Sequence, residues 1–325
     1  MRRKALIAHM ALAALGAASG IGIPVLAQAQ TWPSGTVRII VPFPPGGPTD
    51  VVARLISVKL AKNLDRTVIV ENKAGAAGQL GAQYVANAKP DGNTLLFVVP
   101  AIITNTLFQK DAVDVLPDLR PVIALNTVPN ILLVRHDLPV SNVSDLEKLA
   151  KSKNGEISCA SSGSLPTLGC ELFRAHTKAN ITMVSYKGNG PALAALGSGE
   201  VSMLFDVANT AAEAAKAGRA KALATTNDRP MTGLFADLPL MKASYAGFDL
   251  VSWQGLMAPR HTPDDIVAAA NAAINKVLED PEIRQAFDAA MLAPVGGPAE
   301  RFQAMIKSDS EKYATVVKNA GIQPQ

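Results

Sequence analysis

The chain has 325 residues, of which 48% are hydrophobic, 18% are charged and 5% are aromatic. This length suits two α/β domains or lobes. Removing Arg2, Arg3 and Lys4 from the formal net charge of +4 leaves a remainder near +1, and this balance, with so few aromatic residues, argues against nucleic-acid binding.

The first residues have the pattern of a cleavable secretion signal. Residues 1–4 are basic, residues 5–26 are mostly apolar and small, and Ala27-Gln28-Ala29 has the small-x-small form of a cleavage site. A membrane anchor is the rival interpretation, but glycines and Pro24 interrupt the apolar run. The sequence therefore predicts that residues 1–29 are a cleaved signal peptide and that the mature chain is soluble outside the cytoplasm.

The remainder alternates between strand-like and helix-like runs. Strands are expected at 36–41, 67–70, 94–99, 131–134, 156–160, 181–185, 201–205 and 220–225, and helices at 49–63, 77–88, 144–152, 166–178, 190–198 and 209–217. After Gly247 the pattern changes to an extended apolar run at 248–257, followed by helices at 263–279, 281–290 and 298–319. The alternation predicts an α/β fold with parallel strands and helices on both faces.

The most informative local pattern follows the first expected strand. Pro42-Phe43-Pro44-Pro45-Gly46-Gly47-Pro48 is a Pro/Gly-rich turn, and Thr49-Asp50 opens a helix. Glycines let a ligand approach the backbone, and the free N–H groups of a helix start attract an anion. Asp50 is explained most simply as an acid in a first helical turn. Its functional alternatives are to orient the turn or to bind a ligand amine or water.

Three more turns with glycine follow predicted strands. They are Glu71-Asn72-Lys73-Ala74-Gly75-Ala76-Ala77-Gly78, Ser161-Ser162-Gly163-Ser164-Leu165-Pro166-Thr167 and Tyr186-Lys187-Gly188-Asn189-Gly190-Pro191. All four turns lie at carboxyl ends of strands, where open α/β sheets bind ligands. Because two belong to each half of the chain, we expect a cleft between two lobes. Each feature also has a purely structural interpretation. The turns could simply connect strands to helices, Lys187 could be a surface charge, and Asp206 could cap the next helix.

Several other kinds of site are not supported. No G-x-G-x-x-G or G-x-x-x-x-G-K-[ST] stands in a strand–helix context, so no nucleotide cofactor is expected. No nucleophile and base are paired, so an enzyme is disfavoured. Two cysteines and scattered histidines form no zinc pattern, so no metal is expected. Cys159 and Cys170 could pair in an oxidising compartment or remain as buried thiols.

Taken in order, the motifs resemble one family, the periplasmic solute-binding receptors of tripartite tricarboxylate transporters, called the Bug or TctC family. They are Trp32-Pro33, 41–54 (VPFPPGGPTDVVAR), 70–78 (VENKAGAAG), 90–96 (PDGNTLL), Tyr186-Lys187-Gly188 with Pro191-Ala192-Leu193, Gly199-Glu200-Val201, Phe205-Asp206 and Trp253-Gln254-Gly255. The resemblance covers 32 to about 320, nearly the whole mature chain.

The resemblance implies a two-lobed α/β periplasmic-binding-protein fold of type II, each lobe a mainly parallel sheet flanked by helices. Lobe 1 would comprise 30–125 and 252–325, lobe 2 would comprise 126–251, and the hinge crossovers would lie near 124–131 and 246–254. The ligand-binding residues it implies are Phe43, Gly46, Gly47, Thr49, Asp50, Ala74, Gly75, Ala76, Pro100, Ala101, Ser162, Gly163, Ser164, Tyr186, Lys187, Gly188, Asn189 and Asp206.

The function implied is capture of a small carboxylate metabolite in the periplasm and delivery to the permease subunits of a transporter, by a monomer without cofactor, metal or catalysis. Sensing for a two-component receptor and a periplasmic enzyme are the alternatives. Three departures from the family pattern stand at the turns. Pro48 replaces a serine and removes a hydroxyl and an N–H, and Asn189-Gly190-Pro191 replaces Ser-Ala-Pro. The third turn, at Leu165-Pro166-Thr167-Leu168, lacks the histidine that the family often has there. These departures leave the ligand's identity open.

Overall fold

The computed structural model describes residues 32–152, 156–248 and 250–322, so the expected signal peptide lies outside the described residues. The strands are β1 (Val37–Val41), β2 (Val68–Asn72), β3 (Thr94–Val98), β4 (Leu119–Arg135), β5 (Ser158–Ser161), β6 (Thr182–Ser185), β7 (Met203–Val207), β8 (Ala220–Thr225), β9 (Val251–Pro259) and β10 (Ala293–Pro294). The α-helices are α1 (Pro48–Leu64), α2 (Gln79–Ala86), α3 (Pro100–Phe108), α4 (Val143–Ser152), α5 (Ser164–Thr177), α6 (Asn189–Ser198), α7 (Ala208–Lys216), α8 (Met241–Ser244), α9 (Asp264–Leu278), α10 (Pro281–Ala289) and α11 (Ala299–Ala320).

The strands form a mixed sheet in the order β2-β1-β3-β9-β4-β7-β5-β6. Strands β2, β1 and β3 are parallel to one another, and so are β7, β5 and β6. Antiparallel strands β9 and β4 lie between these two parallel sets. The α/β fold expected from the alternating pattern is confirmed, with antiparallel strands at its centre.

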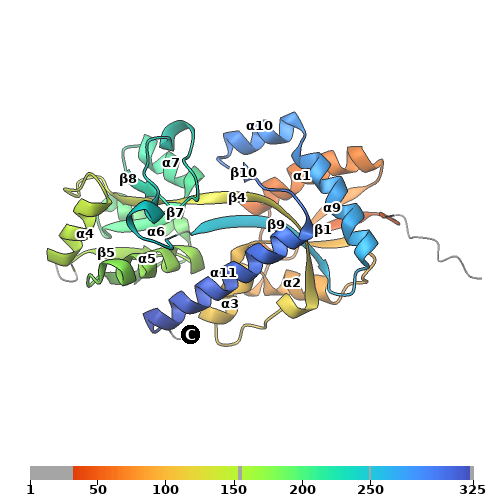
Figure 1. Ribbon diagram of the computed structural model, residues 1–325, viewed down its shortest axis with the longest axis horizontal. Coiled ribbons are helices and arrows are strands. Elements are labelled where there is room, and N and C mark those ends of the chain that lie inside the picture. Colours follow the sequence, from red (N-terminus) through yellow and green to blue (C-terminus); the bar gives the residue numbers. More distant parts are fainter. Residues whose placement is uncertain (1–31, 153–155, 249, 323–325) are drawn as a thin grey trace, which may run out of the picture. The chain divides into compact units, whose positions relative to one another are not determined.

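Strand β4 is much longer than the sequence predicted. It runs for 17 residues, whereas the apolar pattern indicated a strand only at 131–134. Its first part pairs with β9 from Leu119 to Pro129, and its last part pairs with β7 and β8 from Asn130 to Arg135. The pattern missed the first part because prolines, Asn126 and two register shifts interrupt its alternation. In Figure 1, β4 and β9 run between the two parallel sets.

Helix α3 is another element that the sequence analysis missed, as it also missed the short elements α8 and β10. Its segment, PAIITNTLF, is rich in β-branched residues, which have low helix propensity. Pro100 at the first helical position was the available signal for a helix start. Burial of Ile102, Ile103 and Asn105 compensates for the weak propensity. The consequence for the candidate site is that Pro100 and Ala101 belong to a helix start.

One apolar cluster connects the two parallel sets. It includes Val98 and Ile102 from one part of the chain and Cys159 and Leu168 from the other. A second cluster packs α1 and α9 against the other face of β1, β3 and β9. At the centre, the rings of Trp253 and Phe302 meet edge to face with centroids 5.1 Å apart.

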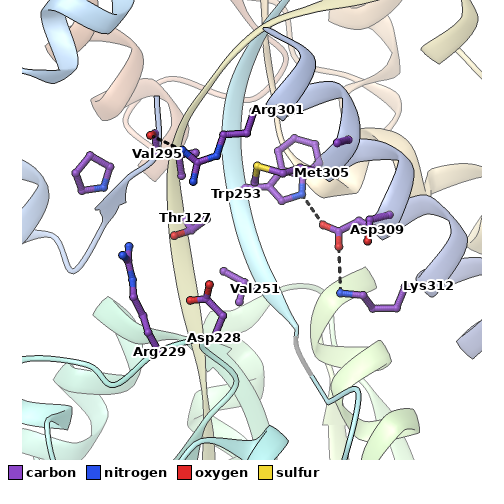
Figure 2. Close-up of a pocket in the computed structure, with 13 residues that line it drawn as sticks. Thr127, Asp228, Arg229, Val251, Trp253, Val295, Arg301, Met305, Asp309 and Lys312 are labelled. Atoms are coloured by element: carbon purple, nitrogen blue, oxygen red, sulfur yellow. Dashed lines mark hydrogen bonds and ion pairs between the residues drawn. The ribbon is translucent and has the colours of Figure 1, made fainter. Parts of the chain in front are cut away.

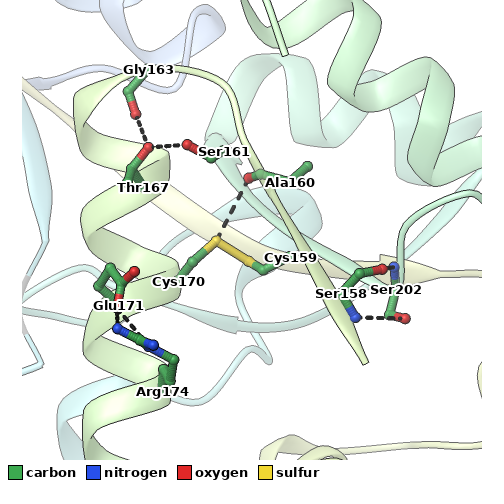
Figure 3. Close-up of a disulfide and its surroundings, with 10 residues drawn as sticks. All are labelled: Ser158, Cys159, Ala160, Ser161, Gly163, Thr167, Cys170, Glu171, Arg174 and Ser202. Atoms are coloured by element: carbon green, nitrogen blue, oxygen red, sulfur yellow. Dashed lines mark hydrogen bonds and ion pairs between the residues drawn. A yellow bond between two sulfur atoms is a disulfide. The ribbon is translucent and has the colours of Figure 1, made fainter. Parts of the chain in front are cut away.

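Cys159 and Cys170, whose pairing the sequence left open, form a disulfide with their Cα atoms 6.0 Å apart (Figure 3). Both residues are fully buried. The bond joins β5 to α5, the two elements on either side of the turn at Ser162 and Gly163. It therefore fixes the strand and helix that carry the third glycine turn of the sequence analysis.

Candidate ligand-binding site

The predicted turns lie side by side because their strands are neighbours. Val41 at the end of β1 is in register with Asn72 at the end of β2, and β3 lies on the other side of β1. In the second parallel set, Ser161 ends β5 in register with Ser185 of β6. The sheet thus forms two groups of turns, one after β1, β2 and β3 and one after β5, β6 and β7.

The first turn is organised by the buried carboxylate of Asp50. Its Oδ2 accepts hydrogen bonds from the Gly46 N–H at 3.0 Å and from Arg54 Nε at 2.9 Å. Its Oδ1 accepts from Asn72 Nδ2 at 2.9 Å, and the same amide nitrogen donates to the Phe43 carbonyl at 3.1 Å. Asp50 therefore holds the two ends of the turn to each other and to β2.

The charge of Asp50 is stabilised where it lies. The Arg54 guanidinium, followed by the Gly46 N–H and Asn72, holds the pKa of the Asp50 carboxyl well below its usual range, although burial alone would raise it. Of the alternatives for Asp50, this geometry supports orientation of the turn. Arg54 and Asn72 are positioning residues that the sequence analysis did not single out. Their signals were the i,i+4 spacing of Arg54 from Asp50 and the place of Asn72 at a strand end.

Backbone N–H groups remain available at this turn. Helix α1 has Gly47 at its N-cap with no side-chain cap, and Pro48 occupies the first helical position. The N–H groups of Gly47, Thr49 and Asp50 have no acceptor among the described residues, because the first intrahelical bond joins Val51 N–H to the Gly47 carbonyl. The Gly46 N–H is occupied by Asp50. A ligand anion would therefore meet donors from Gly47, Thr49 and Asp50.

The neighbouring turns complete this group. Ala74, Gly75 and Ala76 are exposed, and Gly75 and Ala76 have positive φ angles of 146° and 46°. A non-glycine residue at positive φ is costly, so the surrounding structure must hold it. Asn105 of α3 contributes by donating to the Ala77 carbonyl at 3.0 Å. Pro100 and Ala101 follow β3 at the start of α3.

The second group of turns is held by three polar side chains. Ser162 Oγ donates to Asn189 Oδ1 at 2.9 Å, and Asn189 Nδ2 donates to Asp206 Oδ1. Asp206 also accepts from Thr210 Oγ1 at 2.7 Å and from the Val207 N–H at 2.8 Å. The structure thus brings together Ser162, Asn189 and Asp206, which are far apart in the sequence. Their polar atoms tie the starts of α5, α6 and α7 together.

Two polar groups of the Tyr186-Lys187-Gly188 turn are engaged in hydrogen bonds within the protein. Tyr186 Oη donates to Glu200 Oε1 at 2.7 Å, and the Gly188 N–H donates to the Tyr186 carbonyl at 3.0 Å. Lys187 is exposed. Glycines at the N-caps of α5 and α6, Gly163 and Gly188, leave their first helical turns without a side-chain cap. Backbone donors are again the groups left uncovered.

Burial raises the pKa of Asp206 from an ordinary value of 3.8 to about 6, against the opposite effects of its three hydrogen-bond donors. A carboxyl with a raised pKa binds its proton more tightly in the folded state, so the free energy of unfolding rises as pH falls through about 6, and the gain is complete below about 4. We expect this carboxyl to make the protein roughly 1 kcal/mol more stable at pH 5 than at pH 7. Urea denaturation of the wild type and Asp206→Asn at both pH values measures it. An equal pH dependence in the two proteins would contradict the prediction.

A cavity of about 730 Å³ is lined by none of the predicted residues (Figure 2). Thr127 of β4, Trp253 of β9 and residues of α11 line it, with Asp228 and Arg229 from the loop after β8. Of the five charged side chains that line it, Asp309 and Lys312 are already engaged with each other: Asp309 accepts from Trp253 Nε1 at 2.7 Å and pairs with Lys312 at 3.2 Å. The uncovered backbone donors therefore favour the carboxyl edge of the parallel strands as the candidate ligand site.

The described ranges also bear on metal sites and on membrane spans. There, no group of three or more His, Cys, Asp or Glu side chains is arranged to hold a metal ion. No helix in the same ranges combines the length and apolar character needed to cross a bilayer.

Comparison with known proteins finds one family and several relatives that match most of the chain. A family model described as the receptor of the tripartite tricarboxylate transporter family matches residues 52–322. Protein BugT of Bordetella pertussis is 33% identical over 310 residues, which is 94% of this chain and 94% of BugT. A UPF0065 protein of Pseudomonas sp. strain P51 is 32% identical over 302 residues, covering 89% and 87% of the two chains.

Solved structures are similar over most of the chain. A protein of R. palustris solved with adipate has a TM-score of 0.77 and 32% identity, covering 90% of this chain and all of that one. The periplasmic binding protein BugD has a TM-score of 0.73 and 30% identity over 90% and 100% of the chains. MatC from Rhodopseudomonas palustris, solved with malate, has a TM-score of 0.72 and 32% identity over 88% and 99%.

Proposed function

The chain belongs to the tripartite tricarboxylate transporter receptor family, and on that premise we propose that it captures a small carboxylate metabolite in the periplasm and delivers it to a membrane permease of that transporter class. The observation that carries the proposal is the set of uncovered N–H groups of Gly47, Thr49 and Asp50 at the start of α1. Such donors and the helix dipole favour a carboxylate without a basic side chain.

The ligand is proposed to lie between two lobes, 30–125 with 252–325 and 126–251. Support comes from the sheet: β4 and β9 connect two parallel sets, and each set carries its own group of turns at its carboxyl ends. Closure would be a hinge motion in the crossover segments of these two strands. The second group of turns, held by Ser162, Asn189 and Asp206, would then contact the far side of the ligand.

Side chains are proposed to shape this site and backbone groups to bind the ligand. The polar side-chain atoms of Asp50, Asn72 and Asn189 form hydrogen bonds that hold the turns in place. Relatives solved with adipate and malate bind dicarboxylates, and we extend that ligand class to this protein. We expect binding without turnover, because Asp50, Asn72 and Asn189 do not form a pair of nucleophile and base.

Calorimetric titration tests the proposal. The mature protein is titrated with succinate, malate, adipate and an aromatic monocarboxylate, with the corresponding neutral amides as controls. We expect at least one carboxylate to bind with a Kd in the micromolar range or below, and its amide to bind at least about 100-fold more weakly, because two or more charge-assisted N–H bonds are lost. Equal binding of an acid and its amide would contradict the carboxylate assignment.

A further inference from the structure

Two amide side chains face each other across the central strands. Asn126 of β4 is in register with Gln254 of β9, and Asn126 Nδ2 donates to Gln254 Oε1 at 3.0 Å. The two residues are 0% and 6% exposed. Buried amides are costly unless their polar atoms are paired, so the remaining atoms of this pair need an explanation.

The pairing leaves one acceptor and one donor unused. Asn126 Oδ1 is buried and has no hydrogen-bond partner within the described part of the chain. Gln254 Nε2 has no acceptor among the described residues. If both amides are rotated by 180°, the unused groups become the Asn126 nitrogen and the Gln254 oxygen. One donor and one acceptor are therefore left unused in either orientation. A buried acceptor beside an unused donor fits a group that both donates and accepts.

Strand registers place this pair at the carboxyl edge of β3. Val98, the last residue of β3, is opposite Gly255, so Gln254 is the first residue of β9 beyond that strand. Ile40 is opposite Leu96, which places Phe43 level with Val99 and therefore with Gln254. Phe43 in the first turn, Val99, Gln254 and Asn126 are thus successive neighbours across the sheet at this edge.

The two amides also point to the face that α1 covers. Leu256, two residues from Gln254, packs with Val41 and Phe97 in the cluster that contains the buried side of α1. Successive side chains of a strand alternate between faces, so Gln254 shares the face of Leu256. The next residue pair, Thr127 and Trp253, lines the cavity on the opposite face (Figure 2). Asn126 and Gln254 therefore lie on the face of the sheet that α1 and α9 cover, away from that cavity.

We propose that Asn126 and Gln254 form a hydroxyl-binding subsite of the ligand site. Gln254 Nε2 donates to the hydroxyl oxygen, and the hydroxyl proton is donated to Asn126 Oδ1. A water molecule takes this place in the empty protein. A carboxylate only accepts and would leave Asn126 Oδ1 unpaired, whereas a hydroxyl satisfies both groups. The inference rests on the proposed function and narrows the ligand to a hydroxy-substituted carboxylate.

The test compares acids that differ only by a hydroxyl. Malate and succinate, and 3-hydroxyadipate and adipate, are titrated into the wild type, Gln254→Leu and Thr127→Val. The last variant alters the same strand pair on the opposite face and serves as the matched control. We expect the wild type and the control to favour the hydroxy acid of at least one pair by about tenfold, the value of two lost hydrogen bonds. In Gln254→Leu that preference should fall below about twofold.

The outcomes separate the subsite from the proposed function. Carboxylate binding without a hydroxyl preference, or a preference that survives Gln254→Leu with an unchanged melting temperature, overturns the subsite and leaves carboxylate capture intact. A crystal structure of the empty protein gives a readout that needs no ligand. An ordered oxygen atom within hydrogen-bond distance of both amides supports the subsite even if the acids in the panel fail to bind. Absence of that oxygen overturns it.

Discussion

Asp50→Ala is expected to weaken carboxylate binding at least about 100-fold and to lower the free energy of unfolding by about 2–3 kcal/mol. The substitution removes the acceptor of three donors, leaves the Gly46 N–H without its partner, and leaves the Asn72 amide nitrogen with the Phe43 carbonyl alone. The ion pair itself adds little to this loss because the Arg54 side chain is 51% exposed. The larger effect is on the turn, whose backbone donors must be fixed before the ligand arrives.

A matched variant separates this role from the general effect of an acid in a first helical turn. Asp264 stands in the first turn of α9 and pairs with Arg120 at 2.7 Å, but its side chain is 93% exposed. Asp264→Ala should change the free energy of unfolding by less than about 1 kcal/mol and leave the affinity unchanged. Calorimetry and urea denaturation measure both quantities. Equal effects of the two substitutions would show that Asp50 does not organise the ligand site.

The first turn shows how far the sequence could reach. Strand β1, the glycine doublet and the start of α1 were all predictable from apolar spacing and turn residues. The hydrogen bond from the Gly46 N–H to Asp50 was not predictable, because it depends on how the turn folds back on its own helix. Nor was the contact with Asn72, since it depends on the pairing of β1 with β2. The sequence therefore located the turn, while the division between shaping and binding groups required coordinates.

The central strands set the other limit of sequence reasoning. Asn126 interrupts the apolar alternation of β4, so pattern analysis began the strand at 131, too late to include it. Gln254 stood in a recognised motif, but no local signal connected it with a residue 128 positions earlier. Long-range pairing of an irregular strand is a tertiary property, and local periodicity carries no information about it. The Ser162–Asn189–Asp206 network was more accessible, because each member followed a predicted strand.

Gly47→Val is expected to weaken carboxylate binding at least about 100-fold while changing the free energy of unfolding by less than about 1 kcal/mol. Gly47 is the N-cap of α1, with φ of −78° and ψ of 170°, angles that valine adopts without strain. A Cβ at this position would lie 3.8 Å from the Pro44 carbonyl, so it fits. An N-cap side chain lies over the second and third helical N–H groups, here those of Thr49 and Asp50. Valine would therefore cover the donors with methyl groups.

Two comparisons make this prediction specific to the uncovered donors. Gly35→Val adds the same side chain before β1, at the opposite end of the strand, where the nearest atom to a Cβ is 4.0 Å away, and should leave binding unchanged. Gly47→Ser supplies a hydroxyl that accepts from the same N–H groups, so it should raise the free energy of unfolding by a few tenths of a kcal/mol while weakening binding. A cap that strengthened both the helix and ligand binding would refute capture by these donors. A higher free energy of unfolding together with a lower affinity in Gly47→Ser would mean that the helix start is left uncapped so that it can bind the ligand.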